Sequence, residues 1–280
     1  MRRAVKTTGI YYKEIIKEYF LGTVLYILRY RGGPFYIVKK LLCRKLKNDI
    51  IKRKFDRRGV AQMIIKKSGV KKLEEYYNQA GNQVIVVAGQ LSCGKEELFL
   101  DFAKDKKLMY YRCRQASANE QLELMKQEIE RQFQVKLQKN SYEEYFNRIK
   151  TGNPSKLVIV IDEAQYIIKK DPEFMKAIVK LKAKKLYPGP VMVILATSSL
   201  TWLRNDMAEE IGESVKKIDG ILQVDDLNFL EVVRAFPDFS SVECIQIYGV
   251  LGGVPGYLNR WDARLSFKEN ICNLVLARDG

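Results

Sequence analysis

The chain has 280 residues, 47% of them hydrophobic and 29% charged, so it can bury one large core or two smaller ones and is not intrinsically disordered. It contains no histidine, so the usual general base and the commonest metal ligand are both missing. Its 5 cysteines form no C-x-x-C pair, which argues against a disulfide framework or zinc site and favours a reducing, cytoplasmic location.

The first 60 residues carry most of the positive charge. They hold 17 Lys and Arg against 4 acidic residues, a net charge of +13 out of +16, together with 6 of the 16 tyrosines. Basic side chains interleaved with aromatic ones can bind nucleic acid, and a membrane surface or an acidic partner protein are other candidates. Apolar residues near helical spacing between Ile15 and Leu28 favour another interpretation, an amphipathic arm that packs on the protein's own core.

No apolar stretch is long enough to span a bilayer. The most apolar one, Tyr19–Leu28, is bounded by Glu18 and Arg29. We therefore expect a soluble protein without a transmembrane segment.

From residue 61 onward, short apolar runs alternate with segments of helical periodicity. The apolar runs predict buried strands at 84–88, 108–111, 157–161 and 191–196, and residues 221–224 are a candidate strand within the mostly helical segment that follows. The periodic segments predict helices over 118–133 and 172–186, the second capped by Asp171 with Pro172 in its first turn. This alternation predicts an α/β fold, a parallel sheet with helices on both faces.

The same pattern suggests three parts. We expect a mostly helical, basic N-terminal arm over 1–60, an α/β core over 61–220 and a small, mostly helical domain over 221–280.

Residues 84–98 read VIVVAGQLSCGKEEL, a buried strand followed by a glycine-containing loop and a helical pattern. Glycines let a backbone approach an anion closely, and the amides at the start of a helix point at phosphates. The loop therefore predicts an ATP site in which Lys95 contacts the β and γ phosphates. The residues expected to bind the nucleotide here are Gly89, Gln90, Leu91, Ser92, Cys93, Gly94, Lys95, Glu96 and Glu97.

Asp162 and Glu163 follow the apolar run at 157–161, about seventy residues after the loop. In P-loop sites the first acid of such a pair holds Mg²⁺ through water and the second polarises the attacking water, although a lone pair can instead cap a helix. The order of loop and acidic pair favours the catalytic interpretation. The run at 191–196 is followed by Thr197 and Ser198, whose hydroxyls are candidates to sense a γ phosphate.

The motifs VIVVAGQLSCGKEEL, LVIVIDEAQYI, VMVILATSS and LGGVPGYLNRWD, in this order, resemble those of the archaeal-type AAA ATPases. These belong to the STAND class of P-loop NTPases, and the resemblance covers about residues 62–280. It implies a P-loop core, ATP or ADP as ligand with Mg²⁺, and a helical lid. The glycine-x-proline of that lid falls on Gly253-Val254-Pro255, which would place Pro255 near the adenine; the same residues can simply end one helix and begin the next. Arginines that contact a γ phosphate often come from a second subunit, so a homo-oligomer stays open.

The departures from the family concern the loop and the chain ends. Glu96 stands where the family carries Thr, and Gln90 and Leu91 replace basic residues. Glu96 either coordinates Mg²⁺ together with Asp162 or repels the phosphates, at a cost on the order of a few kcal/mol. The family's entry motif is barely recognisable over 63–70. Its members usually continue past the lid into a winged-helix or other effector module, so this chain is either a shortened copy or acts through its basic N-terminal arm.

These observations lead to three functional hypotheses. We expect a nucleotide-dependent switch that binds ATP in weakened form and hydrolyses it slowly or not at all. One alternative is a nucleic-acid-binding or scaffold protein whose P-loop fold has lost its nucleotide. Another is a slow but real ATPase in which Glu96 serves as a metal ligand.

Overall fold

The structure is a computed structural model that describes residues 63–149, 156–184, 186–187 and 189–277. This part of the chain divides into two compact units, Met63–Asp226 and the helices from Leu227 on. The predictions for the basic segment of residues 1–60 lie outside the described residues.

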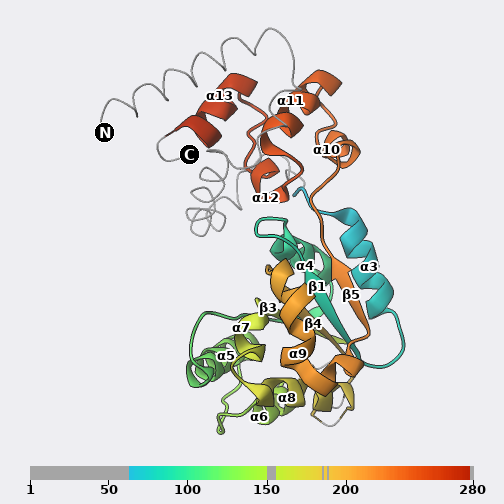
Figure 1. The fold of residues 1–280 in the computed structure, drawn as a ribbon, viewed down its shortest axis with the longest axis vertical. Helices are drawn as coiled ribbons and strands as arrows, with labels where there is room; N and C mark the ends of the chain where they lie inside the picture. The colour runs from blue at the N-terminus through green and yellow to red at the C-terminus, as the bar shows by residue number, and fades with distance from the viewer. Residues whose placement is uncertain (1–62, 150–155, 185, 188, 278–280) are drawn as a thin grey trace. The chain divides into compact units, whose positions relative to one another are not determined.

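Five parallel strands form one sheet in the order β2-β3-β4-β1-β5 (Figure 1). The strands are β1 Gln83–Ala88, β2 Lys107–Arg112, β3 Leu157–Asp162, β4 Val191–Thr197 and β5 Gly220–Gln223. Four of them were predicted from the apolar runs, the fifth was a candidate at 221–224, and the predicted α/β fold is confirmed. The three central strands are buried at every position, as expected for a sheet covered on both faces.

Because the strands are parallel, their carboxyl ends share one edge of the sheet, which we call the carboxyl edge. The register places Ala88 beside Thr197 and Arg112 beside Asp162. The residues that follow β1, β3 and β4 therefore meet at this edge, where ligands of open α/β sheets bind.

Two helices, α3 (Lys67–Tyr77) and α4 (Lys95–Ala103), cover one face of the sheet. Leu73 of α3 and Phe99 of α4 pack against Ile85 and Val87 of β1. The odd and even residues of β1 thus enter different cores, as the period of a strand requires.

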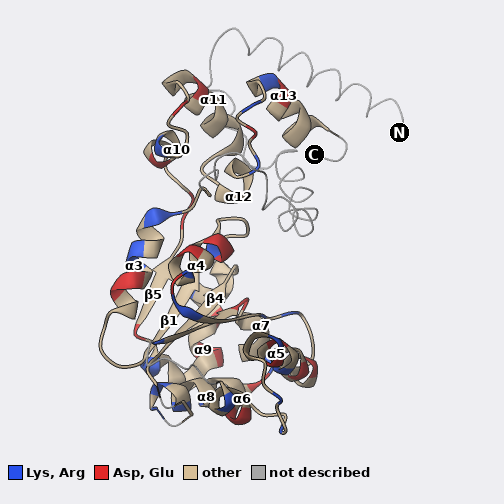
Figure 2. Ribbon diagram, turned by 180° about the vertical axis from the view of Figure 1, so that it is seen from behind, with Lys and Arg blue, Asp and Glu red and all other residues tan. Residues whose placement is uncertain are grey.

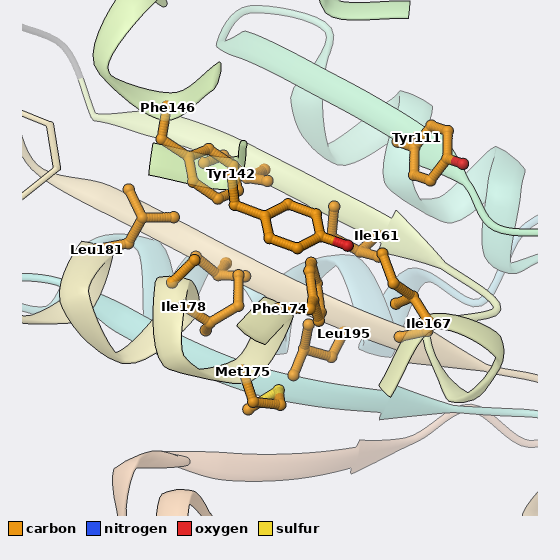
Figure 3. Packing of buried hydrophobic residues seen from close by; sticks show 14 of the residues in the cluster. Tyr111, Tyr142, Phe146, Ile161, Ile167, Phe174, Met175, Ile178, Leu181 and Leu195 are labelled. Atoms are coloured by element: carbon orange, nitrogen blue, oxygen red, sulfur yellow. The ribbon is translucent and has the colours of Figure 1, made fainter. Parts of the chain in front are cut away.

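The other face carries a larger helical layer, α5 (Ala118–Phe133), α6 (Tyr142–Arg148), α7 (Gln165–Ile168), α8 (Pro172–Lys182) and α9 (Met207–Ile211). Figure 3 shows Tyr142 of α6 and Phe174 of α8 packed beside Ile161 and Leu195 of the sheet. The rings of Tyr142 and Phe174 meet edge to face, with centroids 5.4 Å apart. A π-helical turn (Trp202–Asp206) and a 3₁₀ turn (Gly212–Lys217) flank α9.

Two helices were predicted by their periodicity, and one prediction was too long. Helix α5 has the predicted bounds, but α8 ends at Lys182 rather than at residue 186. The side chain of Asn82 explains the early end. Its Nδ2 donates to the carbonyls of Leu181 (2.9 Å) and Lys182 (3.1 Å), while its Oδ1 accepts from Val191 N (3.0 Å).

A single lysine ties elements together at the opposite, amino edge of the sheet. Lys156 Nζ donates to the carbonyls of Tyr77 (2.6 Å) and Gln79 (2.7 Å) and to Gln83 Oε1 (2.6 Å). It also lies 5.5 Å from the centre of the Tyr77 ring. The end of α3 and the starts of β1 and β3 are thereby joined.

The C-terminal unit begins at Leu227, after β5 of the core sheet, and is helical. It contains α10 (Phe229–Ala235), α11 (Ser241–Leu251), α12 (Pro255–Leu258), α13 (Phe267–Ile271) and a π-helical turn (Cys272–Leu276). A Cβ at Gly253 would lie 1.7 Å from Leu227 O, and Leu227 N donates to Gly253 O (2.7 Å). Only glycine allows this contact, because any side chain would collide with backbone.

Within the described ranges, basic and acidic residues share the same elements (Figure 2). In helix α3, for example, lysines in the first part are followed by two glutamates (Figure 2). None of the helices that the structure describes is long and apolar enough to cross a membrane.

Candidate phosphate-binding site

The loop from Gly89 to Gly94 joins the carboxyl end of β1 to the first turn of α4. Gly89 N donates to Thr197 O (3.1 Å), which holds the start of the loop against β4. A Cβ at Gly89 would lie 2.6 Å from Cys93 Sγ and 2.7 Å from Val224 O, so the backbone packs too closely for a side chain. Gly94 (φ 81°) is the N-cap of α4 and has no side chain to accept from the amides of the first turn, which are the donors that a helix start offers to an anion.

Lys95, the first residue of α4, is buried and folds over the loop. Its Nζ donates to Gly89 O (2.7 Å) and to Gln90 O (3.3 Å). An ammonium group has three N–H donors, so one remains for a ligand. The lysine is therefore placed at the loop, where a phosphate-binding role requires it.

The remaining loop residues differ in exposure. Gln90 and Leu91 are exposed, Ser92 is half-buried, and Cys93 is buried. Burial raises the pKa of the Cys93 thiol to about 11, although the charge of Lys95 lowers it in part. The thiol is therefore protonated and unreactive at neutral pH.

Asp162, at the end of β3, is buried and accepts several hydrogen bonds. Its Oδ2 accepts from Tyr110 Oη (2.8 Å) and lies 2.6 Å from the Arg112 guanidinium, while its Oδ1 accepts from Glu163 N (3.1 Å). Burial and the charge of Asp162 raise the pKa of Tyr110, so its hydroxyl keeps its proton and donates.

Arg112 links Asp162 to the loop helix. Its Nη2 donates to Glu96 Oε2 (3.0 Å), so one guanidinium contacts both carboxylates. Burial lowers the pKa of Arg112, but the negative charges of Asp162 and Glu96 more than offset this and the pKa is raised. The sequence predicted Glu96 either as a metal ligand or as a group that repels the phosphates. Neither prediction included this ion pair with Arg112.

The sequence analysis missed Arg112 and Tyr110. Both lie on β2, which was predicted only as a buried strand. The available signal was a basic residue directly after an apolar run, but its meaning depends on β2 pairing with β3, which places Arg112 opposite Asp162.

Glu97 lies beside these groups in the first turn of α4. Burial raises the pKa of its carboxyl, and the charge of Glu96 adds to the effect, while Arg112 and Lys95 oppose it. Two acidic residues at a helix start stabilise the helix dipole but compete with a bound anion.

Glu163 is held in the left-handed backbone region, at φ 54°. Its Oε2 accepts from Ser198 Oγ (2.7 Å), Ser198 N (3.2 Å) and Gln165 Nε2 (2.8 Å). Thr197 is fully buried, and its Oγ1 accepts from Ser199 N (3.1 Å) instead. Of the two hydroxyl residues expected to sense a γ phosphate, the structure brings Ser198 to Glu163.

Two residues of the site have a strained backbone. Of the four non-glycine residues with positive φ in the described ranges, Ser92 lies in the loop and Glu163 in the acidic pair. Such conformations cost about 1–3 kcal/mol each and cluster at functional sites.

Pro255 lies in the C-terminal unit. It is the first helical residue of α12, and Gly252 (φ 63°) ends α11. Both residues thus lie at helix ends, which was the alternative interpretation of this motif. The contact of Pro255 with adenine stays a prediction.

The side chains at the carboxyl edge do not fit Mg²⁺ as they stand. Within the part of the chain that the structure describes, no group of three or more His, Cys, Asp or Glu residues could hold a metal ion. Asp162 Oδ2 and Glu96 Oε2, the expected metal ligands, both accept from the Arg112 guanidinium.

A parallel sheet in this order, with a glycine loop and lysine after β1 and an acidic pair after β3, defines a P-loop NTPase. Residues 66–261 match the family described as an ATPase domain predominantly from Archaea, and the chain belongs to this family. Membership implies a nucleotide-binding site. Placement in the STAND class stays a prediction.

Known proteins resemble this chain in sequence or in fold, each at low sequence identity. An uncharacterized protein of Methanocaldococcus jannaschii is 23% identical over 198 residues, which are 69% of this chain and 44% of that protein. A Walker-type ATPase of Pyrococcus abyssi superimposes with a TM-score of 0.53 and 17% identity, covering 70% of this chain and 66% of that one. The ORC2 protein of Aeropyrum pernix in its ADP form also gives 0.53, with 15% identity over 76% of this chain and 65% of that one. The chain thus spans less than two thirds of each of these proteins.

Proposed function

We propose that this protein is an ATP-binding switch whose hydrolysis is slow or absent. One observation carries the proposal: the loop Gly89–Gly94 and Lys95 lie at the same edge of the sheet as Asp162 and Glu163. Backbone amides of the loop and of the first turn of α4 would bind the phosphates, and Lys95 would donate its remaining N–H.

Binding should be weak because the local charges cancel. Lys95 and Arg112 are positive and Glu96 and Asp162 are negative, so these four side chains together carry no net charge. A triphosphate therefore gains less attraction here than at a loop with Thr at position 96. Glu97 adds a further acidic group at the helix start.

Hydrolysis should be slow because one carboxylate oxygen of Glu163 is already engaged by other donors. A general base must accept a proton from the attacking water, and Oε2 of Glu163 accepts from Ser198 and Gln165. A hydrolytic role can be tested with Glu163→Gln, which should abolish phosphate release if the activity belongs to this site. Unchanged release would assign it to a contaminant.

The switch rests on the division of the described chain into two compact units, with the boundary in the sequence after Asp226. Motion between compact units of one chain is the default expectation. We propose that ATP and ADP change the relation between the core and the helices from Leu227 on. Amide hydrogen exchange of those helices with ATP, with ADP and without nucleotide tests this, and identical exchange in all three would refute it.

Calorimetric titration with ATP and ADP tests the binding itself. Lys95→Ala should weaken binding at least about tenfold, equivalent to 1.4 kcal/mol. Lys104→Ala, a matched loss of an exposed lysine at the end of the same helix, should leave binding unchanged. Failure of the wild-type protein to bind at millimolar nucleotide would refute the proposed function.

A second candidate function rests on the net charge of +13 over residues 1–60. This segment would bind nucleic acid or an acidic partner independently of ATP. Fluorescence anisotropy with labelled DNA and RNA should then show binding that falls steeply with salt and disappears on deletion of these residues. Binding to liposomes of acidic lipid instead would point to a membrane surface.

A further inference from the structure

The contacts of Arg112 define a cation that joins the two carboxylates expected to hold a metal. Its guanidinium lies 2.6 Å from Asp162 Oδ2 and 3.0 Å from Glu96 Oε2. Nη2 also donates to Tyr110 Oη (3.2 Å), and Tyr110 in turn donates to Asp162. The arrangement is a connected network and not a single surface ion pair.

We propose that Arg112 is the resident cation of this phosphate site in place of Mg²⁺, so that nucleotide binding does not require a divalent ion. This inference rests on the proposed nucleotide function. In it, Arg112 supplies the positive charge that a divalent ion would otherwise bring to the phosphates. Glu96, in place of Thr, supplies the second carboxylate that holds the guanidinium. The unusual residue of the loop and the missed arginine on β2 thereby have a common explanation.

Two physical reasons make Arg112 a competitor of a divalent ion. The guanidinium occupies one oxygen of each carboxylate, Asp162 Oδ2 and Glu96 Oε2, and a divalent ion placed between them would be repelled by its positive charge. Both carboxylates would have to leave Arg112 before a metal could enter.

Arg112 can also serve the phosphate directly. Its side chain is 44% exposed, and among the described contacts its donors Nε and Nη2 are used while Nη1 has none. Guanidinium donors form strong, directional hydrogen bonds to phosphate oxygens. A residue held on one side by carboxylates can therefore present its other side to a nucleotide.

The test compares ATP affinity in buffer with excess MgCl₂ and in buffer with EDTA. For the wild-type protein the two dissociation constants should agree within about twofold, whereas Arg112→Met should bind at least about tenfold more tightly with Mg²⁺ than without. Met keeps the aliphatic stem and removes the charge. Arg114→Met, two residues further on, is the matched control and should behave as the wild type.

A second measurement requires no nucleotide. Mn²⁺ titration followed by electron paramagnetic resonance should show no saturable site in the wild type and one in Arg112→Met, where Asp162 and Glu96 are released. Saturable Mn²⁺ uptake by the wild type, or ATP binding that needs Mg²⁺ with Arg112 intact, would overturn the inference. Both of these results come from the wild-type protein, so the test stands even if the variant fails to fold.

The two proposals fail in different ways. Wild-type protein that binds ATP only with Mg²⁺ refutes the role of Arg112 and leaves the switch intact. Wild-type protein that binds no nucleotide in either buffer refutes the nucleotide function, and the Mn²⁺ titration then decides separately whether Arg112 holds the cation position.

Discussion

Replacement of Arg112 by methionine should destabilise the core unit chiefly through Asp162. The Asp162 side chain is only 3% exposed, whereas those of Arg112 and Glu96 are 44% and 47% exposed. Breaking a fully buried ion pair costs about 3–5 kcal/mol and an exposed pair contributes about 0.2–1 kcal/mol. Asp162 keeps Tyr110 and Glu163 as donors, and water can reach the guanidinium side, so we expect a loss of about 2 kcal/mol.

Double-mutant cycles divide this loss between the two carboxylates. The coupling of Arg112→Met with Asp162→Asn should be about 1.5–2 kcal/mol, and that with Glu96→Gln at most about 0.5 kcal/mol. Urea unfolding can be followed by the fluorescence of Trp202, which is buried and lies in the core unit. A Trp261→Phe background removes the other of the chain's 2 tryptophans, so the signal reports this unit alone.

Two results would refute this reasoning. A coupling to Glu96 as large as that to Asp162 would mean that burial does not set the strength of the network. An Arg112→Met variant within about 0.5 kcal/mol of the wild type would mean that Asp162 needs no cation.

Three further outcomes are expected from the site. Gly89→Ala should lower the free energy of unfolding by about 1–3 kcal/mol in urea titrations, because its Cβ would meet Val224 O and Cys93 Sγ, and should weaken ATP binding in calorimetry. Burial raises the pKa of Glu97 in the folded protein, so protonation of Glu97 stabilises the fold. This stabilisation is fully present below the ordinary Glu pKa of about 4.3 and is lost as the pH rises through the folded-state pKa. Glu97→Gln should therefore be more stable than the wild type at neutral pH, with the difference vanishing in acid; a gain that persists in acid would contradict this. Because the pKa of Cys93 is raised to about 11, maleimide at pH about 8 should modify the exposed Cys272 and spare Cys93, as read by peptide mass spectrometry.

The strands were predictable from the sequence because they are covered on both faces. A strand buried on both sides is a continuous apolar run, and β1, β3 and β4 have no exposed position that could interrupt the pattern. The phosphate loop was predictable for a related reason, since glycine and lysine spacing is local information between two recognisable elements.

Other features depend on partners that are distant in sequence. The end of α8 is set by Asn82, 99 and 100 residues away from the carbonyls that it binds. Arg112 contacts Asp162 only because β2 pairs with β3, and the order of strands in a sheet cannot be predicted from the sequence of either strand alone. The roles of Thr197 and Ser198 likewise separate only when hydrogen bonds are known, since both follow the same apolar run.

The lysine at the amino edge joins three elements through acceptors that carry no charge. All three hydrogen-bond acceptors of Lys156 are neutral oxygens. At the carboxyl edge Arg112 is held by carboxylates, and its contact with Glu96 lies at the surface, where dissolved salt screens ion pairs. Added salt should therefore loosen the pairing of Arg112 with Glu96 and leave the hydrogen bonds of Lys156 unchanged.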